Sequence, residues 1–199
     1  MIIERSKTKT INETPALRRP GLFVSTALSA NKATVAALAL LLGCGLTVLA
    51  TDNRAPEVPA EIAVPVGNKV HFHGYAIGVQ IYTWNGVSWG SAVPEATLFD
   101  GNGVVAIHFA GPTWESNSGS RVVGALPPKS GVTVDTNSIA WLLLKALRTE
   151  GPGIFANTTY IHRVNTVGGT APSADGAFVG QVARVPYAAD YFFYRKANH

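Results

Sequence analysis

Residues 69–110 read KVHFHGYAIGVQIYTWNGVSWGSAVPEATLFDGNGVVAIHFA, and this stretch decides the fold class. Three runs rich in β-branched and aromatic residues are separated by turn residues, Asn85-Gly86 in the first gap and Gly101-Asn102-Gly103 in the second. Such turns between apolar runs are a strong short-range signal for β-hairpins. The stretch therefore predicts sequential antiparallel strands.

The same pattern continues to the C-terminus. Further strands are predicted at RVVGAL (121–126), TTYIHRVNT (158–166) and VPYAADYFFYRK (185–196). SIAWLLLKALRTEG (138–151) fits a helix capped by Ser138 and ended by Gly151, or a fully buried strand, and periodicity does not separate the two; strand is favoured. We expect one mainly antiparallel β-domain, either a β-sandwich or a closed β-barrel.

The N-terminal part differs from the rest in charge and hydropathy. Residues 1–50 hold six basic and two acidic side chains, which account for the whole net charge of +4. A basic stretch followed by the apolar run 33–50 is typical of an export signal, although eighteen apolar or small residues also suffice for a membrane anchor. The predicted organisation is a signal peptide or anchor at 1–50, a Pro-rich linker at 51–65 and the β-domain at 66–199.

Three fates of this leader are open. Cleavage after Ala50 is favoured because Val48 and Ala50 are the small residues that such a site needs, ahead of lipidation at Cys44 and of retention as an anchor through residues 33–50. All three predict an exported protein, periplasmic or extracellular, that meets a membrane only through its N-terminal segment. The oligomeric state stays open.

Composition excludes several classes of function. Because residues 51–199 are neutral overall, the domain lacks the positive charge expected of a nucleic-acid partner. Cys44 is the single cysteine, so the domain has no disulfide, no cysteine zinc site and no cysteine nucleophile. His71 and His73 lie two residues apart in a predicted strand, on one face, but no carboxylate follows at metal-ligand spacing. We predict no metal and no cofactor.

The segment HFAGPTWESNSGS (108–120) carries the candidate catalytic residues, His108 and Glu115, on either side of Gly111-Pro112. A histidine beside a carboxylate is a workable acid–base pair. The alternative is a structural corner, with Trp114 packed beneath the turn and the polar side chains bonded to loop amides. The corner is favoured.

Aromatic and polar residues of the other strands are the candidate ligand-binding set. Their density suits either the core of a small barrel or a pocket that stacks a flat or sugar-like ligand. Arg163 is expected to pair with Asp190, because a carboxylate among aromatic residues is rarely buried alone. The candidates are Gln80, Tyr82, Trp114, Arg163, Asp190 and Tyr191.

Taken in order, GVQIYTW, PEATLFDGNG, HFAGPTWE, WLLLKA, YIHRVNTVGGTAP and VPYAADYFFYRK resemble an exported bacterial and fungal family, domain of unknown function 3455. The resemblance spans about Val64 to Lys196. It implies secretion and a single mainly-β domain, but no activity. Family members tend to have cysteines at the positions of Trp84 and Gly176, which implies a disulfide in relatives that this chain cannot form.

Three functions remain as hypotheses. The first is an exported binding module for a small molecule or glycan, the second an enzyme that uses His108 and Glu115, and the third a structural surface protein. A pocket where aromatic rings meet Arg163 would favour binding, and a pocket that joins His108 to Glu115 would favour the enzyme. Absence of a pocket would favour the structural role.

Overall fold

The computed structural model describes residues 54–197, which contain a nine-stranded antiparallel sheet and one short 3-10 helix. No helix in this part of the chain is long and apolar enough to cross a membrane. The predicted leader, with Cys44 and the cleavage site after Ala50, lies outside the described residues. The elements are η1 (Ala60–Ile62), β1 (Asn68–Thr83), β2 (Val93–Asp100), β3 (Gly103–Phe109), β4 (Thr113–Ser116), β5 (Arg121–Gly124), β6 (Ser130–Val132), β7 (Trp141–Glu150), β8 (Thr158–Gly168) and β9 (Val182–Lys196).

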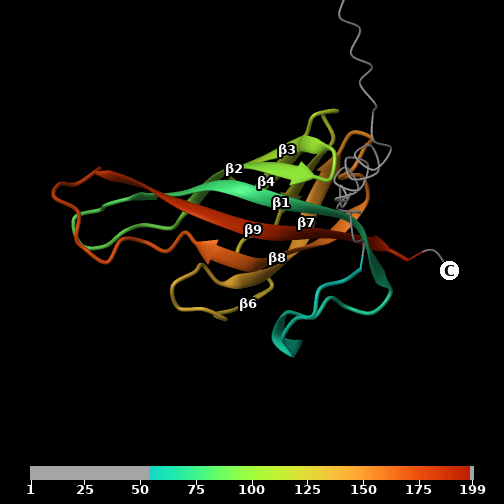
Figure 1. Cartoon of the computed structure of the whole chain (residues 1–199), viewed down its shortest axis with the longest axis horizontal. Coiled ribbons are helices and arrows are strands. Elements are labelled where there is room, and N and C mark those ends of the chain that lie inside the picture. Colours follow the sequence, from blue (N-terminus) through green and yellow to red (C-terminus); the bar gives the residue numbers. More distant parts are fainter. Residues whose placement is uncertain (1–53, 198–199) are drawn as a thin grey trace, which may run out of the picture. The chain divides into compact units, whose positions relative to one another are not determined.

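The sheet closes into an eight-stranded antiparallel barrel (Figure 1). Neighbours follow the order β5-β4-β3-β2-β1-β9-β8-β7, and β5 then pairs with β7 to complete the ring. The long strand β7 serves two partners, since residues 141–143 pair with β6 and residues 146–150 with β5. The prediction of a mainly antiparallel β-domain is confirmed, and the architecture is the barrel.

Each predicted strand is present, and the ambiguous segment 138–151 contains strand β7. Its continuous apolar run follows from its position, because Leu144 lies in the barrel core while Leu143 packs on the outside. The first part of β7 is thus buried on both faces and shows no alternation of polarity, while Lys145, Leu147 and Arg148 further along are exposed. Periodicity alone therefore could not separate it from a helix.

Strand alternation divides the apolar residues between two clusters. Phe193 of β9 belongs to the interior core, together with Phe72, Leu98 and Trp114. Phe192, next to it in sequence, points to the outer face and joins a second cluster. Successive side chains of a strand point to opposite faces, so β9 is buried on both sides.

The second cluster is covered by the segment before β1. Ile62 of η1 is fully buried, and its carbonyl oxygen accepts a 2.6 Å hydrogen bond from Nε2 of His162 on β8. Val58 and Val64 pack against the same cluster. Residues 58–64 of the stretch predicted as a Pro-rich linker thus pack on the barrel.

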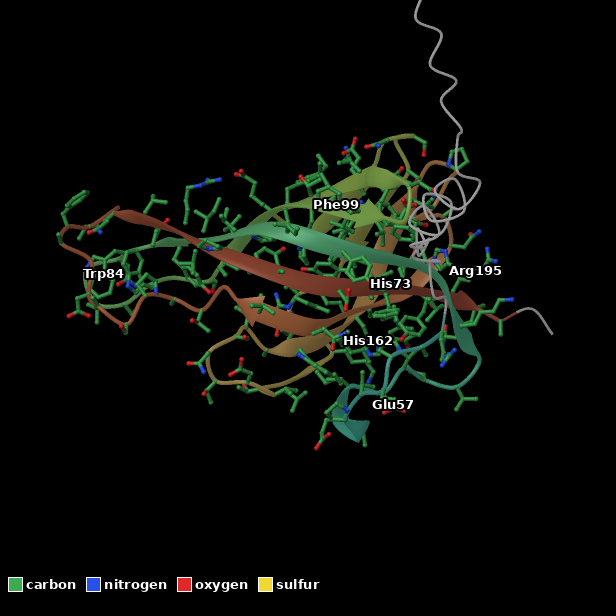
Figure 2. All side chains as sticks on the ribbon, in the orientation of Figure 1. Glu57, His73, Trp84, Phe99, His162 and Arg195 are labelled. Carbon is green, nitrogen blue, oxygen red and sulfur yellow. The ribbon has the colours of Figure 1, made fainter. Side chains whose placement is uncertain are left out.

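Beyond the barrel, β1 and β9 continue as a paired arm, with Trp84 at its far end (Figures 1 and 2). A Cβ atom placed on Gly176 would lie 2.7 Å from the Cβ of Trp84. The two positions at which the family resemblance implies cysteines are therefore direct neighbours. Here a bulky indole and a glycine pack in their place.

Candidate functional site

One end of the barrel holds a pocket of about 330 Å³, which we call the barrel pocket. The connections after β1, β3 and β5 meet at this end because neighbouring strands are antiparallel. Its polar and aromatic lining comes from Ser91 and from four predicted site residues, His108, Trp114, Arg163 and Tyr191. Its apolar lining includes Ala92, Val93, Pro94, Ala110, Pro112, Leu126, Leu142 and Leu144.

A stack of rings forms one wall of the barrel pocket. His108 and Trp114 are register partners on β3 and β4, and their rings lie parallel with centroids 4.2 Å apart. Tyr191 stands edge-on to both, at 5.2 Å from His108 and 5.3 Å from Trp114. The neighbouring strands β3 and β4, together with β9 further along the barrel wall, thus fix three aromatic side chains on the inner face.

His108 is held in one neutral tautomer. Its Nδ1 lies 2.8 Å from the carbonyl oxygen of Thr113, which can only accept, so Nδ1 carries the proton and Nε2 is an acceptor. Burial lowers the pKa of His108 to about 3, and the positive charge of Arg163 acts in the same direction, against the Thr113 hydrogen bond. The imidazole is therefore uncharged near neutral pH.

Arg163 supplies the one charge in the pocket lining. Its Nε and Nη2 donate to the carbonyl oxygen of Ala140 at 3.2 and 2.8 Å, which fixes the plane of the guanidinium. Burial raises the pKa of three tyrosine hydroxyls in the barrel, and the charge of Arg163 opposes each rise, at Tyr82, Tyr187 and Tyr191. The guanidinium thus acts on groups from several strands.

The predicted partner of Arg163 lies elsewhere. Asp190 faces outward, where its Oδ1 lies 3.1 Å from Nε2 of His73 and its Oδ2 accepts a 2.7 Å hydrogen bond from Asn165. Its register partner on β8 is Val164, whereas Arg163 stands opposite Tyr191. The expected ion pair between Arg163 and Asp190 is wrong, because the two side chains lie on opposite faces of the sheet.

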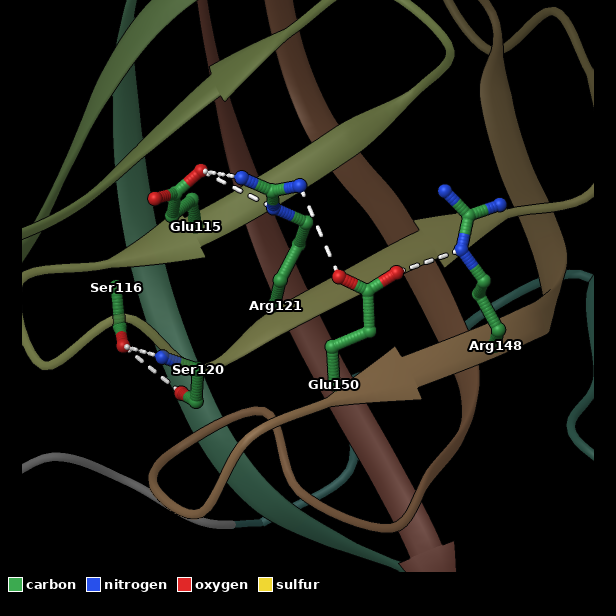
Figure 3. Close-up of polar contacts among 6 residues, drawn as sticks. All are labelled: Glu115, Ser116, Ser120, Arg121, Arg148 and Glu150. Carbon is green, nitrogen blue, oxygen red and sulfur yellow. Dashed lines mark hydrogen bonds and ion pairs between the residues drawn. The ribbon is translucent and has the colours of Figure 1, made fainter.

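The predicted acid–base pair is not formed either. Glu115 stands opposite Ile107, one position away from His108, and points outward to Arg121 at 2.6 Å (Figure 3). His108 points inward. Alternation along the strands therefore separates the two candidate catalytic residues, and Glu115 belongs to a surface ion-pair chain that continues through Arg121 to Glu150.

The rest of the segment 108–120 is a structural turn, as favoured from the sequence. Ser116 Oγ lies 2.8 Å from Ser120 Oγ and accepts a 3.1 Å hydrogen bond from the Ser120 amide. Figure 3 shows this contact beside the outward ion pairs. The hydroxyl groups thus satisfy one another and the loop backbone.

Gln80 and Tyr82 are buried residues of β1 rather than lining residues of the barrel pocket. The Tyr82 hydroxyl donates to the Gly169 carbonyl oxygen at 2.6 Å. Gln80 is 1% exposed, and its Nε2 has no hydrogen-bond partner among residues 54–197. Of the six predicted ligand-binding residues, the pocket therefore brings together Trp114, Arg163 and Tyr191.

His71 and His73 make separate contacts. His71 Nε2 lies 3.1 Å from the Thr158 hydroxyl, and His73 bonds to Asp190. A β-bulge between Val70 and Phe72 interrupts the alternation that placed both histidines on one face. Within residues 54–197 there is no group of three His, Cys, Asp or Glu side chains able to hold a metal ion.

Tyr187 belongs to this region although it was not among the candidate ligand-binding residues. Its hydroxyl lies 3.4 Å from that of Tyr191, and both belong to the interior core. The signal was present in the sequence, because Tyr187, Ala189, Tyr191 and Phe193 alternate along one strand and so share one face.

Comparison with curated proteins found no match, and neither did comparison with solved structures. A family model described as "Protein of unknown function (DUF3455)" matches residues 100–195. This segment runs from the end of β2 to the end of β9 and includes His108, Trp114, Arg163 and Tyr191. By this match, residues 100–195 carry a domain of unknown function, DUF3455.

Proposed function

We propose that the protein is an exported binding module whose barrel pocket takes one small molecule. The observation that carries the proposal is the meeting of Arg163 with the rings of His108, Trp114 and Tyr191 in a pocket of about 330 Å³. Ligand pockets in proteins measure roughly 300 to 1,000 Å³ and are mainly apolar with a few fixed polar groups. Closed barrels of about eight strands are wide enough to hold one small ligand.

A small molecule fits better than an extended glycan. The Trp114 ring is covered on one face by His108 and is 1% exposed, so it offers no free platform for a sugar ring. The remaining lining is largely alkyl. A compact apolar or aromatic body therefore complements this pocket.

The enzyme alternative required His108 within hydrogen-bond reach of Glu115, and the strand register places them on opposite faces. A purely structural role was expected only if the barrel had no pocket, and the barrel has one. Export rests on the basic and apolar pattern of residues 1–50 and belongs to the proposal as well.

Titration with a neutral fluorescent probe, phenylnaphthylamine, tests the binding function on the purified full chain. We expect saturable binding of one probe per chain. Ala110→Phe places a ring at the exposed edge of the pocket and should weaken binding about tenfold or more. Ala177→Phe adds the same ring at an exposed position outside the pocket lining and should leave binding unchanged.

Two results would count against the function. One is probe fluorescence that rises without saturation, as expected for general hydrophobic adsorption. The other is equal affinity for the wild type and the Ala110→Phe variant.

A further inference from the structure

Arg163 is a cation in an apolar pocket without an anionic partner. No carboxylate among residues 54–197 lies within ion-pair distance of Arg163. The carboxylates named above, Glu115, Glu150 and Asp190, each pair with a different basic side chain. Its lining neighbours are alkyl and aromatic side chains and the uncharged Ser91, and His108 is neutral. A charge removed from water is costly unless it is paired, so such a site favours an incoming anion.

Other buried polar groups in the barrel also lack a hydrogen-bond partner. The Trp114 indole Nε1–H is buried and has no hydrogen-bond acceptor among the described residues, while Trp114 itself lines the pocket. Gln80 Nε2, which is buried on β1 opposite the lining residue Pro94, is in the same situation. All of these are donors, as are the hydrogens of Arg163 that Ala140 leaves unbound. Apart from the acceptor Nε2 of His108, these polar groups call for an acceptor on the ligand.

The guanidinium is also positioned in advance. Nε and Nη2 share the Ala140 carbonyl oxygen, and that bond anchors the side chain to the start of β7. The guanidinium also interacts with the Tyr191 hydroxyl, and its other hydrogens remain as donors in one plane. A planar guanidinium recognises a carboxylate through directed, charge-assisted hydrogen bonds, which a flexible ammonium group does not reproduce.

We propose that the physiological ligand is an amphipathic organic acid, with its carboxylate on Arg163 and its apolar body against the alkyl lining of the barrel pocket. This inference rests on the proposed binding function and narrows it to one chemical class. The acceptor Nε2 of His108 suits a hydroxyl or amide donor elsewhere on the acid. The pocket thus selects a single acidic group at one position and little polarity in the rest of the molecule.

A matched pair of ligands tests the charge without altering the protein. Naphthoate and naphthamide have nearly the same shape and differ by one negative charge. Calorimetric titration of the purified full chain at low ionic strength should give an affinity for naphthoate at least about tenfold higher. Added salt should reduce this preference, because a partly open pocket is screened.

Substitutions of Arg163 then test whether this residue is the source of the preference for naphthoate. Arg163→Gln should lower the naphthoate affinity to that of naphthamide and leave the amide unaffected, whereas Arg163→Lys should keep part of the preference. Arg121→Gln is the matched control, since it removes the same charge from the outer face, where Arg121 pairs with Glu115. Thermal unfolding of each variant checks that the barrel is intact.

The outcomes separate the two proposals. Equal affinity for acid and amide, or an acid preference that survives in Arg163→Gln, overturns the anionic ligand while the binding function stands. Failure of both compounds to bind a protein that still binds phenylnaphthylamine has the same meaning. Failure of all three compounds overturns the binding function and this inference together.

Discussion

Trp114→Ala is the substitution that best separates a structural corner from a strained site. The indole is 1% exposed and packs against His108, Tyr191 and Phe193, with centroids 4.2 to 5.7 Å away. Truncation of a buried Trp costs about 3 to 5 kcal/mol. Because Trp114 borders the barrel pocket, water can enter part of the space that is left, and we expect about 3 to 4 kcal/mol.

Its neighbour provides a matched control in the same strand. Glu115 points outward to Arg121, and both side chains are about a third exposed. Partly exposed ion pairs contribute about 0.2 to 1 kcal/mol. Glu115→Ala should therefore cost a small fraction of what Trp114→Ala costs, although the two residues are adjacent.

Urea unfolding followed by circular dichroism measures both effects. With an m-value of about 2 kcal/mol per molar, Trp114→Ala should lower the midpoint by roughly 1.5 to 2 M, and Glu115→Ala by less than about 0.5 M. If Trp114→Ala leaves too little folded protein, Trp114→Phe should give an intermediate loss. Equal midpoints for Trp114→Ala and Glu115→Ala would refute the assignment of Trp114 to the core.

Four further predictions follow from particular residues. Burial holds the pKa of His108 near 3, against 6.5 for an ordinary histidine. As pH falls, His108 therefore takes up a proton in the unfolded chain before it does so in the folded one. The free energy of unfolding should fall as pH drops between these values, and His108→Asn should flatten the fall in pH-dependent urea unfolding. Gly176→Ala brings a methyl group against Trp84, and calorimetric melting should show a loss of about 1 to 3 kcal/mol. Since Cys44 is the single cysteine, reductant should leave the melting temperature unchanged. Cleavage after Ala50 predicts that N-terminal sequencing of the exported protein begins at Thr51, and a lipid on Cys44 found by mass spectrometry would contradict it.

The strands could be predicted from the sequence because their signals are local. Asn85-Gly86 and Gly101-Asn102-Gly103 separate the apolar runs that become the first three strands. The choice between sandwich and barrel could not be made in this way. It depends on the pairing of β5 with β7, residues that lie about 25 positions apart and carry no local mark of their contact.

The candidate site could be predicted only in part, for a reason of the same kind. His108, Trp114, Arg163 and Tyr191 were selected as single residues with suitable chemistry, and the pocket gathers them. Their partners were predicted less well, because hydrogen bonds across a sheet depend on register. His108 is buried, and its ring packs on Trp114. We therefore expect His108→Ala to lower the free energy of unfolding.

The partner of Arg163 shows how a shift of one residue changes a functional conclusion. Sequence reasoning joined it to Asp190, because each charge needed a partner and both lie in aromatic strands. Asp190 stands opposite Val164, so its side chain turns outward and is satisfied by His73 and Asn165. Had the register differed by one residue, the barrel would hold an internal ion pair and its pocket would carry no net charge. The observed register leaves the carboxylate outside and the guanidinium inside, and the missing negative charge is the one that we assign to the ligand.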